Sequence, residues 1–135
     1  MAAAESETGF YPPTLDTLEA LGIEALATIP EDLRRHIENV VIQVAEFPDD
    51  DTVDAMNLES PFDILGLYRG VTLEHRDRGG PPSLDMIFLY RRPILDYWCE
   101  TGEDLALLVR HVLIHEIGHH FGFSDDDMER IEGED

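Results

Sequence analysis

The spacing of hydrophobic residues in the first part of the chain predicts two helices followed by a strand. Leucines and alanines recur at helical intervals over residues 14–27, and Pro30 opens a second helix that we expect to reach Asn39. The segment VVIQVAEF, residues 40–47, is rich in β-branched side chains, which is typical of a buried strand. The acidic stretch that follows, residues 48–63, predicts a solvated loop.

The middle of the chain carries the patterns of two further strands and a short helix. Residues 64–68 predict a short strand, and SLDMIFLYRR, residues 83–92, predicts a longer one that Pro93 ends. A segment rich in glycine and proline, residues 74–83, predicts a flexible loop between them. Residues 94–100 predict a short helix. The chain shows no internal repeat and no domain boundary.

The longest helical pattern covers residues 102–121. Thr101 and Asp104 have the spacing of a capping box at its start. Gly122 stands where a helix can end, because glycine accepts a left-handed backbone conformation at little cost. Apolar residues occur on both sides of this helix, which predicts that it lies in the centre of the fold.

Composition and charge narrow the class of protein. The 135 residues suit a single domain, which we expect over residues 10–135 after a disordered tail, residues 1–9. The 30 acidic residues outnumber 9 basic ones, and the net charge of −21 disfavours binding to nucleic acid or to an anionic membrane. The single cysteine, Cys99, suits a reducing compartment, and no secretory signal is visible. We therefore expect a cytoplasmic protein and, by default, a monomer.

The last helix contains the sequence HEIGHHFGFSD, whose spacing predicts a metal site. His115 and His119 are four residues apart and share one face of the helix, so two imidazoles can bind one zinc ion. After a turn at Gly122, Asp125 can supply a third ligand, which leaves the fourth tetrahedral position for water. Zinc lowers the pKa of such a water to about 7. Glu116, turned by about 100° on the helix, can take its proton and pass it to a leaving amine.

Neighbouring residues offer other ligands. His111 lies four residues before His115, but Val112 stands where the base would be, so we interpret His111 as an outer-sphere or surface residue. His120 points about 100° away from the ligand face and is expected to be exposed or bonded to backbone. Asp126 and Asp127 can replace Asp125 after a small shift of the turn. Ser124 has no evident partner, and we expect it in a loop.

These residues carry a resemblance to a known family. The pattern HExxHxxGxx(H/D) resembles the zinc signature of metzincin-type metallopeptidases, and the segments LGLYRG and LYRRP resemble those of minimal zincin-like metallopeptidases from bacteria. The resemblance implies an α+β fold in which the active-site helix packs against a small mixed sheet beside N-terminal helices. It also implies a zinc-dependent peptidase that acts on a peptide or protein. Metzincins place a methionine beneath the zinc in a tight turn, and Met128 is the candidate here.

Several functional interpretations follow from the sequence. The first is a zinc peptidase with one Zn²⁺ on His115, His119 and Asp125, Glu116 as general base and acid, and a shallow, open cleft. The alternatives are a metal-dependent endoribonuclease and a non-catalytic, metal-stabilised interaction module. A peptide can add as a strand along residues 83–92, although that segment can equally be a core strand.

Two tyrosines also fall near the predicted site. Tyr68 and Tyr90 can help to stabilise an oxyanion, but core packing is the more common role for such residues.

Overall fold

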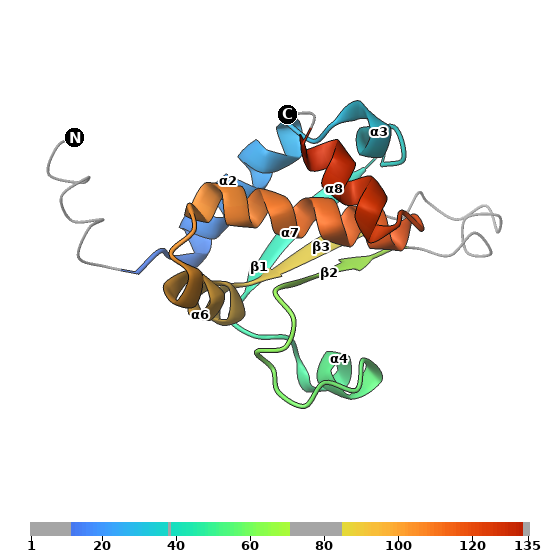
Figure 1. Cartoon of the computed structure of the whole chain (residues 1–135). Coiled ribbons are helices and arrows are strands. Elements are labelled where there is room, and N and C mark those ends of the chain that lie inside the picture. Colours follow the sequence, from blue (N-terminus) through green and yellow to red (C-terminus); the bar gives the residue numbers. More distant parts are fainter. Residues whose placement is uncertain (1–11, 38, 71–84, 134–135) are drawn as a thin grey trace, which may run out of the picture.

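The computed structural model describes residues 12–37, 39–70 and 85–133, in which helices and a small sheet pack against each other (Figure 1). The predicted tail, residues 1–9, and the predicted loop, residues 74–83, lie outside the described residues. The helices are α2 (Leu15–Ala27), α3 (Glu31–Arg34), α4 (Asp50–Ala55), α6 (Arg91–Thr101), α7 (Leu105–His120) and α8 (Asp125–Gly133), and the strands are β1 (Val40–Ala45), β2 (Gly66–Arg69) and β3 (Asp85–Tyr90). The expected α+β class is confirmed.

The three described strands form a mixed sheet in the order β1-β3-β2. β1 runs parallel to β3, with Val40 opposite Asp85, and β2 runs antiparallel to β3, with Tyr68 opposite Ile87. β3 is therefore the central strand. Of the two alternatives for the segment 83–92, the core strand is the one that β3 shows, because both of its edges are already paired.

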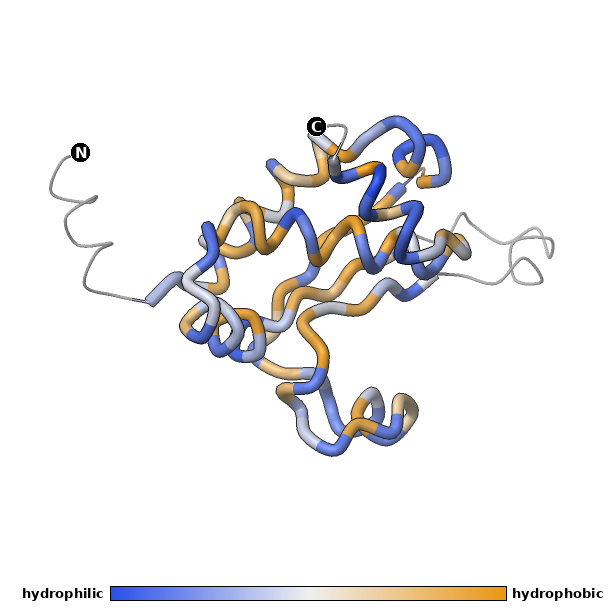
Figure 2. The backbone as a smooth tube through the Cα atoms, in the orientation of Figure 1, coloured by the Kyte–Doolittle hydropathy of each residue, from blue (hydrophilic) through white to orange (hydrophobic). Residues whose placement is uncertain are grey.

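Helices α2 and α7 cover one face of the sheet, and α8 packs on the outer side of α7 (Figure 1). The hydrophobic residues gather in the strands and in the helices that cover them, whereas α8 is largely hydrophilic (Figure 2). The fully buried side chains of this core include Leu18, Leu33, Ile87, Leu89, Leu113, Ile114 and Ile117. The predicted central position of the long helix is thereby confirmed. No helix among the described residues combines the length and apolarity that a bilayer span needs.

Gly22 allows α2 to approach the sheet closely. A Cβ at this position would lie 3.1 Å from the side chains of Ile42 and Leu89. The helix continues through Gly22 to Ala27. The glycine therefore serves close packing in the middle of the helix and does not end it.

Several predicted element boundaries differ from the structure. The second helix is only one turn long, Glu31–Arg34, and does not reach Asn39. The predicted acidic loop contains helix α4, because the Asp49 side chain accepts a hydrogen bond from the Thr52 amide and caps the helix. Hydrogen bonds from the Thr52 hydroxyl and amide lower the pKa of Asp49.

Helix α6 begins directly at the end of β3. Pro93 occupies the first turn of α6, where its missing N–H has no helical partner to lose, so it does not mark a break after the strand. Thr101 is the last residue of α6 and not the cap of α7, so the predicted capping box is wrong.

Candidate metal centre

Helix α7 is delimited by local signals at both ends. The Asp104 side chain accepts a hydrogen bond from the Leu107 amide at 3.1 Å and caps the first turn. At the other end Gly122 has a left-handed backbone, with φ of +83°. The amides of Gly122 and Phe123 donate to the carbonyls of His119 and Gly118, which is the pattern of a Schellman motif. The predicted helix end at Gly122 is confirmed, and the chain reverses there.

Helix α8 begins immediately after this turn, because Ser124 and Asp127 cap each other. The Asp127 amide donates to Ser124 Oγ at 3.1 Å, and the Ser124 amide donates to Asp127 Oδ2 at 3.3 Å. This reciprocal pair is a capping box, so Ser124 lies outside the helices as expected, but the expectation that it has no partner is wrong. Hydrogen bonding of the Asp127 carboxylate to the Ser124 hydroxyl and amide lowers the pKa of Asp127.

The reversal brings together the three residues that the sequence predicts as ligands. One ligand atom each from His115, His119 and Asp125 lies within 4.8 Å of the other two. His119 Nε2 and Asp125 Oδ1 are 3.2 Å apart. The side chains of His119 and Asp125 are 56% and 84% exposed, so this group of three, which we call the triad, is open to solvent.

The donor set of the triad fits zinc. Two imidazoles and one carboxylate are typical ligands of catalytic zinc sites. Zinc–ligand bonds of about 2.0–2.1 Å in a tetrahedron place neighbouring donor atoms about 3.3 Å apart. The observed separation of 3.2 Å between His119 Nε2 and Asp125 Oδ1 already matches that spacing. Asp127 is held by Ser124, so of the three neighbouring aspartates only Asp125 belongs to the group that can bind a metal.

Glu116 lies between α7 and the sheet. Burial raises the pKa of its carboxyl group, and the opposing influences are the nearby His119 and a hydrogen bond from the Tyr68 amide. Gly66 makes room for this contact, because a Cβ there would lie 2.9 Å from Val112 Cγ1 and 3.6 Å from Glu116 Cγ. The bare backbone of β2 thus faces the Glu116 side chain, next to the triad.

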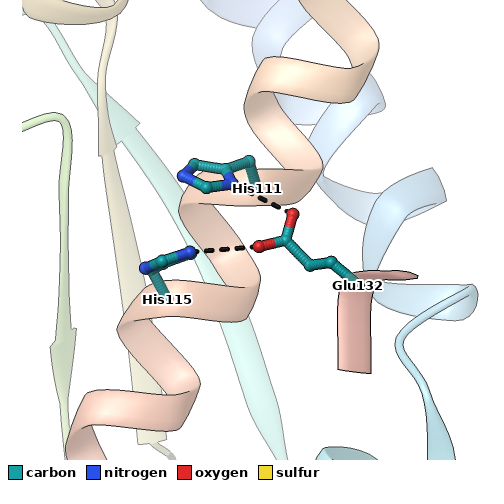
Figure 3. Close-up of side chains that lie close together, drawn as sticks. All are labelled: His111, His115 and Glu132. Carbon is teal, nitrogen blue, oxygen red and sulfur yellow. Dashed lines mark hydrogen bonds and ion pairs between the residues drawn. The ribbon is translucent and has the colours of Figure 1, made fainter. Parts of the chain in front are cut away.

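Glu132 is a residue of this region that the sequence analysis missed. From the last turn of α8 its carboxylate contacts two histidines of α7, with His111 Nδ1 at 2.9 Å and His115 Nε2 at 3.0 Å (Figure 3). His111 was expected at the surface or in the outer sphere of the metal, and its side chain is half exposed with Glu132 as its partner. The capping box at Ser124 was the available signal, since it predicts the helix that carries Glu132.

The remaining candidate residues, His120, Tyr68 and Tyr90, pack against or bond to other side chains of the fold. His120 is exposed, as expected, and its ring stacks on Tyr68 with 4.0 Å between the centroids. The Tyr68 hydroxyl donates to the buried Asp85 carboxylate at 2.6 Å, so it does not point toward a substrate. Tyr90 is buried as well, and burial raises the pKa of its hydroxyl.

Met128 is fully buried against α7. It lies within helix α8 and not in a tight turn, so the turn expected from the metzincin resemblance does not form at this residue. Its sulfur instead occupies the space beside Gly118, in the turn of α7 that separates Glu116 from His119. Met128 therefore fixes the distance between α7 and α8.

The fold and the site together define a small α+β protein with a candidate metal centre on its central helix. A family model described as zincin-like metallopeptidase matches residues 37–134, and the chain belongs to this family. No curated protein matches the chain. A solved structure of a conserved hypothetical protein from Thermus thermophilus is similar to it, with 23% sequence identity and a TM-score of 0.48. That comparison covers 90% of this chain and 100% of the other.

Proposed function

We propose that this protein is a zinc-dependent peptidase in which His115, His119 and Asp125 hold one Zn²⁺ and Glu116 transfers protons. The observation that carries the proposal is the clustering of the three donor atoms within 4.8 Å, beside a partly buried carboxylate on the same helix. Membership of the zincin-like metallopeptidase family supports the reaction class. When bound, Zn²⁺ supplies a Lewis acid for a carbonyl oxygen and lowers the pKa of a water ligand to about 7.

The protein's own contribution is proton transfer and positioning. Glu116 accepts the proton of the attacking water and returns it to the leaving amine. The hydrogen bond from the Tyr68 amide holds the Glu116 carboxylate in place, and burial keeps competing solvent away from it. His119 carries one of the donor atoms and lies close enough to Glu116 to influence the pKa of that carboxyl group.

The substrate is expected at β2, which forms one edge of the described sheet. Leu65 accepts a hydrogen bond from the Tyr90 amide, so Leu65 faces β3 and the alternate residues Gly66 and Tyr68 turn their backbone groups outward. A peptide in extended conformation can pair with the outward backbone of Gly66. The Tyr68 amide already donates to Glu116, so a peptide at this edge would lie next to the proposed base.

The decisive variant is Glu116→Gln. It keeps the shape of the side chain but cannot accept a proton, so we expect unchanged zinc content and a loss of peptide hydrolysis of about 10²-fold to 10⁴-fold. Zinc-loaded wild type is first assayed on pools of internally quenched fluorescent peptides, and the variant is then compared on the pool that is cleaved. Asp126→Asn, which removes a neighbouring exposed carboxylate, serves as the control. Equal rates for wild type and Glu116→Gln would show that Glu116 is not the base.

A coordination count separates the peptidase from a metal-stabilised interaction module. A catalytic zinc site retains a solvent ligand, whereas a structural site is closed by a fourth protein ligand. Glu132 is the carboxylate already placed at His115 Nε2, and it is the obvious fourth ligand for a closed site. X-ray absorption spectra of the zinc-loaded protein and of Glu132→Gln should be the same if the site is open.

A further inference from the structure

We infer that His111, His115 and Glu132 form a second binding site for a divalent transition metal such as Zn²⁺, which shares His115 with the triad. One ligand atom each from these three residues lies within 4.8 Å of the other two. We call this group the upper site. The inference concerns residues outside the HExxHxxGxxD pattern and holds whether or not the triad is catalytic.

The upper site brings its three side chains into direct contact. The carboxylate of Glu132 lies between the two imidazoles, 2.9 Å from His111 Nδ1 and 3.0 Å from His115 Nε2 (Figure 3). The two rings are 4.0 Å apart between centroids, as expected for neighbouring turns of a helix. Small movements bring these three donors to the spacing of about 3.3 Å that zinc requires.

The upper site is better enclosed than the triad. The side chains of His111 and Glu132 are 51% and 24% exposed, against 56% and 84% for His119 and Asp125, and the shared His115 is 26% exposed. Less solvent screening strengthens the attraction between a cation and a carboxylate. The donors also come from two packed helices, so little side-chain freedom remains to be lost on binding.

Metal ions can reach the upper site from solvent. A groove of about 530 Å³ runs along the start of α7, where Tyr97 and Leu107 are among its lining residues, and ends at His111 and Glu132. Glu103 and Asp104 also line this groove, and with Glu132 these carboxylates outnumber the one guanidinium in its lining, that of Arg110. An entry path lined with carboxylates favours the approach of a divalent cation.

The two sites share His115, whose Nε2 faces Glu132. One imidazole nitrogen binds one metal ion, so the sites compete for an ion wherever both use this nitrogen. On the helix, His111 and Glu116 are five residues apart and so about 140° apart around the axis. An ion in the upper site would therefore lie away from Glu116. If the proposed peptidase function is correct, such an ion would occupy a non-hydrolytic position.

The test uses the metal-free full chain, titrated with Co²⁺ by visible absorption and with Zn²⁺ by competition. The double variant His119→Ala/Asp125→Ala keeps only the upper site, and His111→Ala/Glu132→Gln keeps only the triad. His115→Ala removes a ligand from both sites.

The matched control is Glu129→Gln, which removes an exposed carboxylate three residues before Glu132 on α8. Circular dichroism establishes that every variant is folded, and His119→Gln/Asp125→Asn replaces the alanine pair if that pair does not fold.

We expect His119→Ala/Asp125→Ala to bind one equivalent of Co²⁺ at least about 100-fold more tightly than His115→Ala, since three donors remain in place of fewer. Adding Glu132→Gln to this double variant should remove that binding, and adding Glu129→Gln should not. If the double variant binds no more tightly than His115→Ala, the cluster is only hydrogen-bonded and the inference is wrong. Failure of His111→Ala/Glu132→Gln to bind would instead count against the triad and the proposed peptidase, and leave the upper site intact.

Discussion

The sulfur of Met128 occupies the space that a Cβ at Gly118 would need, and a Cβ there would also lie only 2.8 Å from Met128 Cγ. Both residues are buried, one in the last turn of α7 and the other in α8. The two helices that supply the candidate ligands can approach closely only because position 118 has no side chain.

The variant Gly118→Ala should therefore separate α7 from α8. We expect a loss of stability of about 1–3 kcal/mol, because a methyl group is forced into a filled core. Gly133→Ala is the control, since a Cβ at Gly133 meets nothing within 4 Å. Urea unfolding of both variants measures the difference, and equal midpoints would contradict the close packing at Gly118.

A second prediction concerns the turn between α7 and α8. Gly122 has φ of +83°, and an L-residue in this conformation costs about 1–2 kcal/mol. Relaxation of the strained turn should also move Asp125, so we expect Gly122→Ala to weaken Zn²⁺ binding by about tenfold, or about 1.4 kcal/mol.

Gly102 provides a matched control for Gly122. It has φ of +69°, and a Cβ there would meet nothing within 4 Å. It lies between α6 and α7, at the opposite end of α7 from Gly122. Gly102→Ala should lose the same stability in thermal unfolding without changing the affinity for Zn²⁺. A parallel loss of affinity in both variants would show that the effect is general destabilisation.

Metal binding should be visible as thermal stabilisation. A ligand that binds only the folded state adds about 2.7 kcal/mol to its stability at 100 times its Kd. We expect Zn²⁺ to raise the Tm of the chelator-treated protein and chelator to reverse the shift. Mg²⁺ at the same concentration should have little effect, because it prefers oxygen ligands over imidazole. His115→Ala should abolish the response to Zn²⁺, and an undiminished shift in that variant would place the ion elsewhere.

The hydrogen bond between Tyr68 and Asp85 joins β2 to the central strand. The donor hydroxyl and the acceptor carboxylate are 2.6 Å apart and both residues are buried. Tyr68→Phe should cost about 1.5–3 kcal/mol, which is the usual range for a hydrogen bond to a charged group. Tyr97→Phe, at a tyrosine that is 40% exposed, should change the unfolding free energy by less than about 0.5 kcal/mol. Similar unfolding curves for the two variants would argue against a stabilising role of the Tyr68 hydroxyl.

Features that depend on neighbouring residues were predictable from the sequence. The long helix, its end at Gly122 and the strands over Val40–Ala45 and Asp85–Tyr90 follow from local periodicity and glycine chemistry. The same local geometry predicted that His115, His119 and Asp125 could approach one another. The order of the strands in the sheet could not be predicted this way. The hydrophobic periodicity of a strand does not depend on which distant strand pairs with it. The sequence therefore left an edge strand and a core strand equally open for β3.

The contact of Glu132 with the histidines of α7 could not be predicted from neighbouring residues alone. The sequence pattern of the capping box, with Ser124 three residues before Asp127, predicts the start of helix α8. The contact of Glu132 with His115, however, depends on the direction in which α8 leaves the turn. That direction is set by packing of Met128 against Gly118, a pairing of shapes that a sequence pattern does not reveal.

The parallel pairing of β1 with β3 bears on how the molecule assembles. Val40 pairs with Asp85, 45 positions further along the chain, so this ladder cannot form until a long loop has closed. Contacts within helices and between α7 and α8 span far fewer residues. Because non-local pairing slows folding, we expect formation of the sheet to be the slow kinetic step. The two helices that carry the metal donors would then reach their final packing only after distant parts of the chain have met.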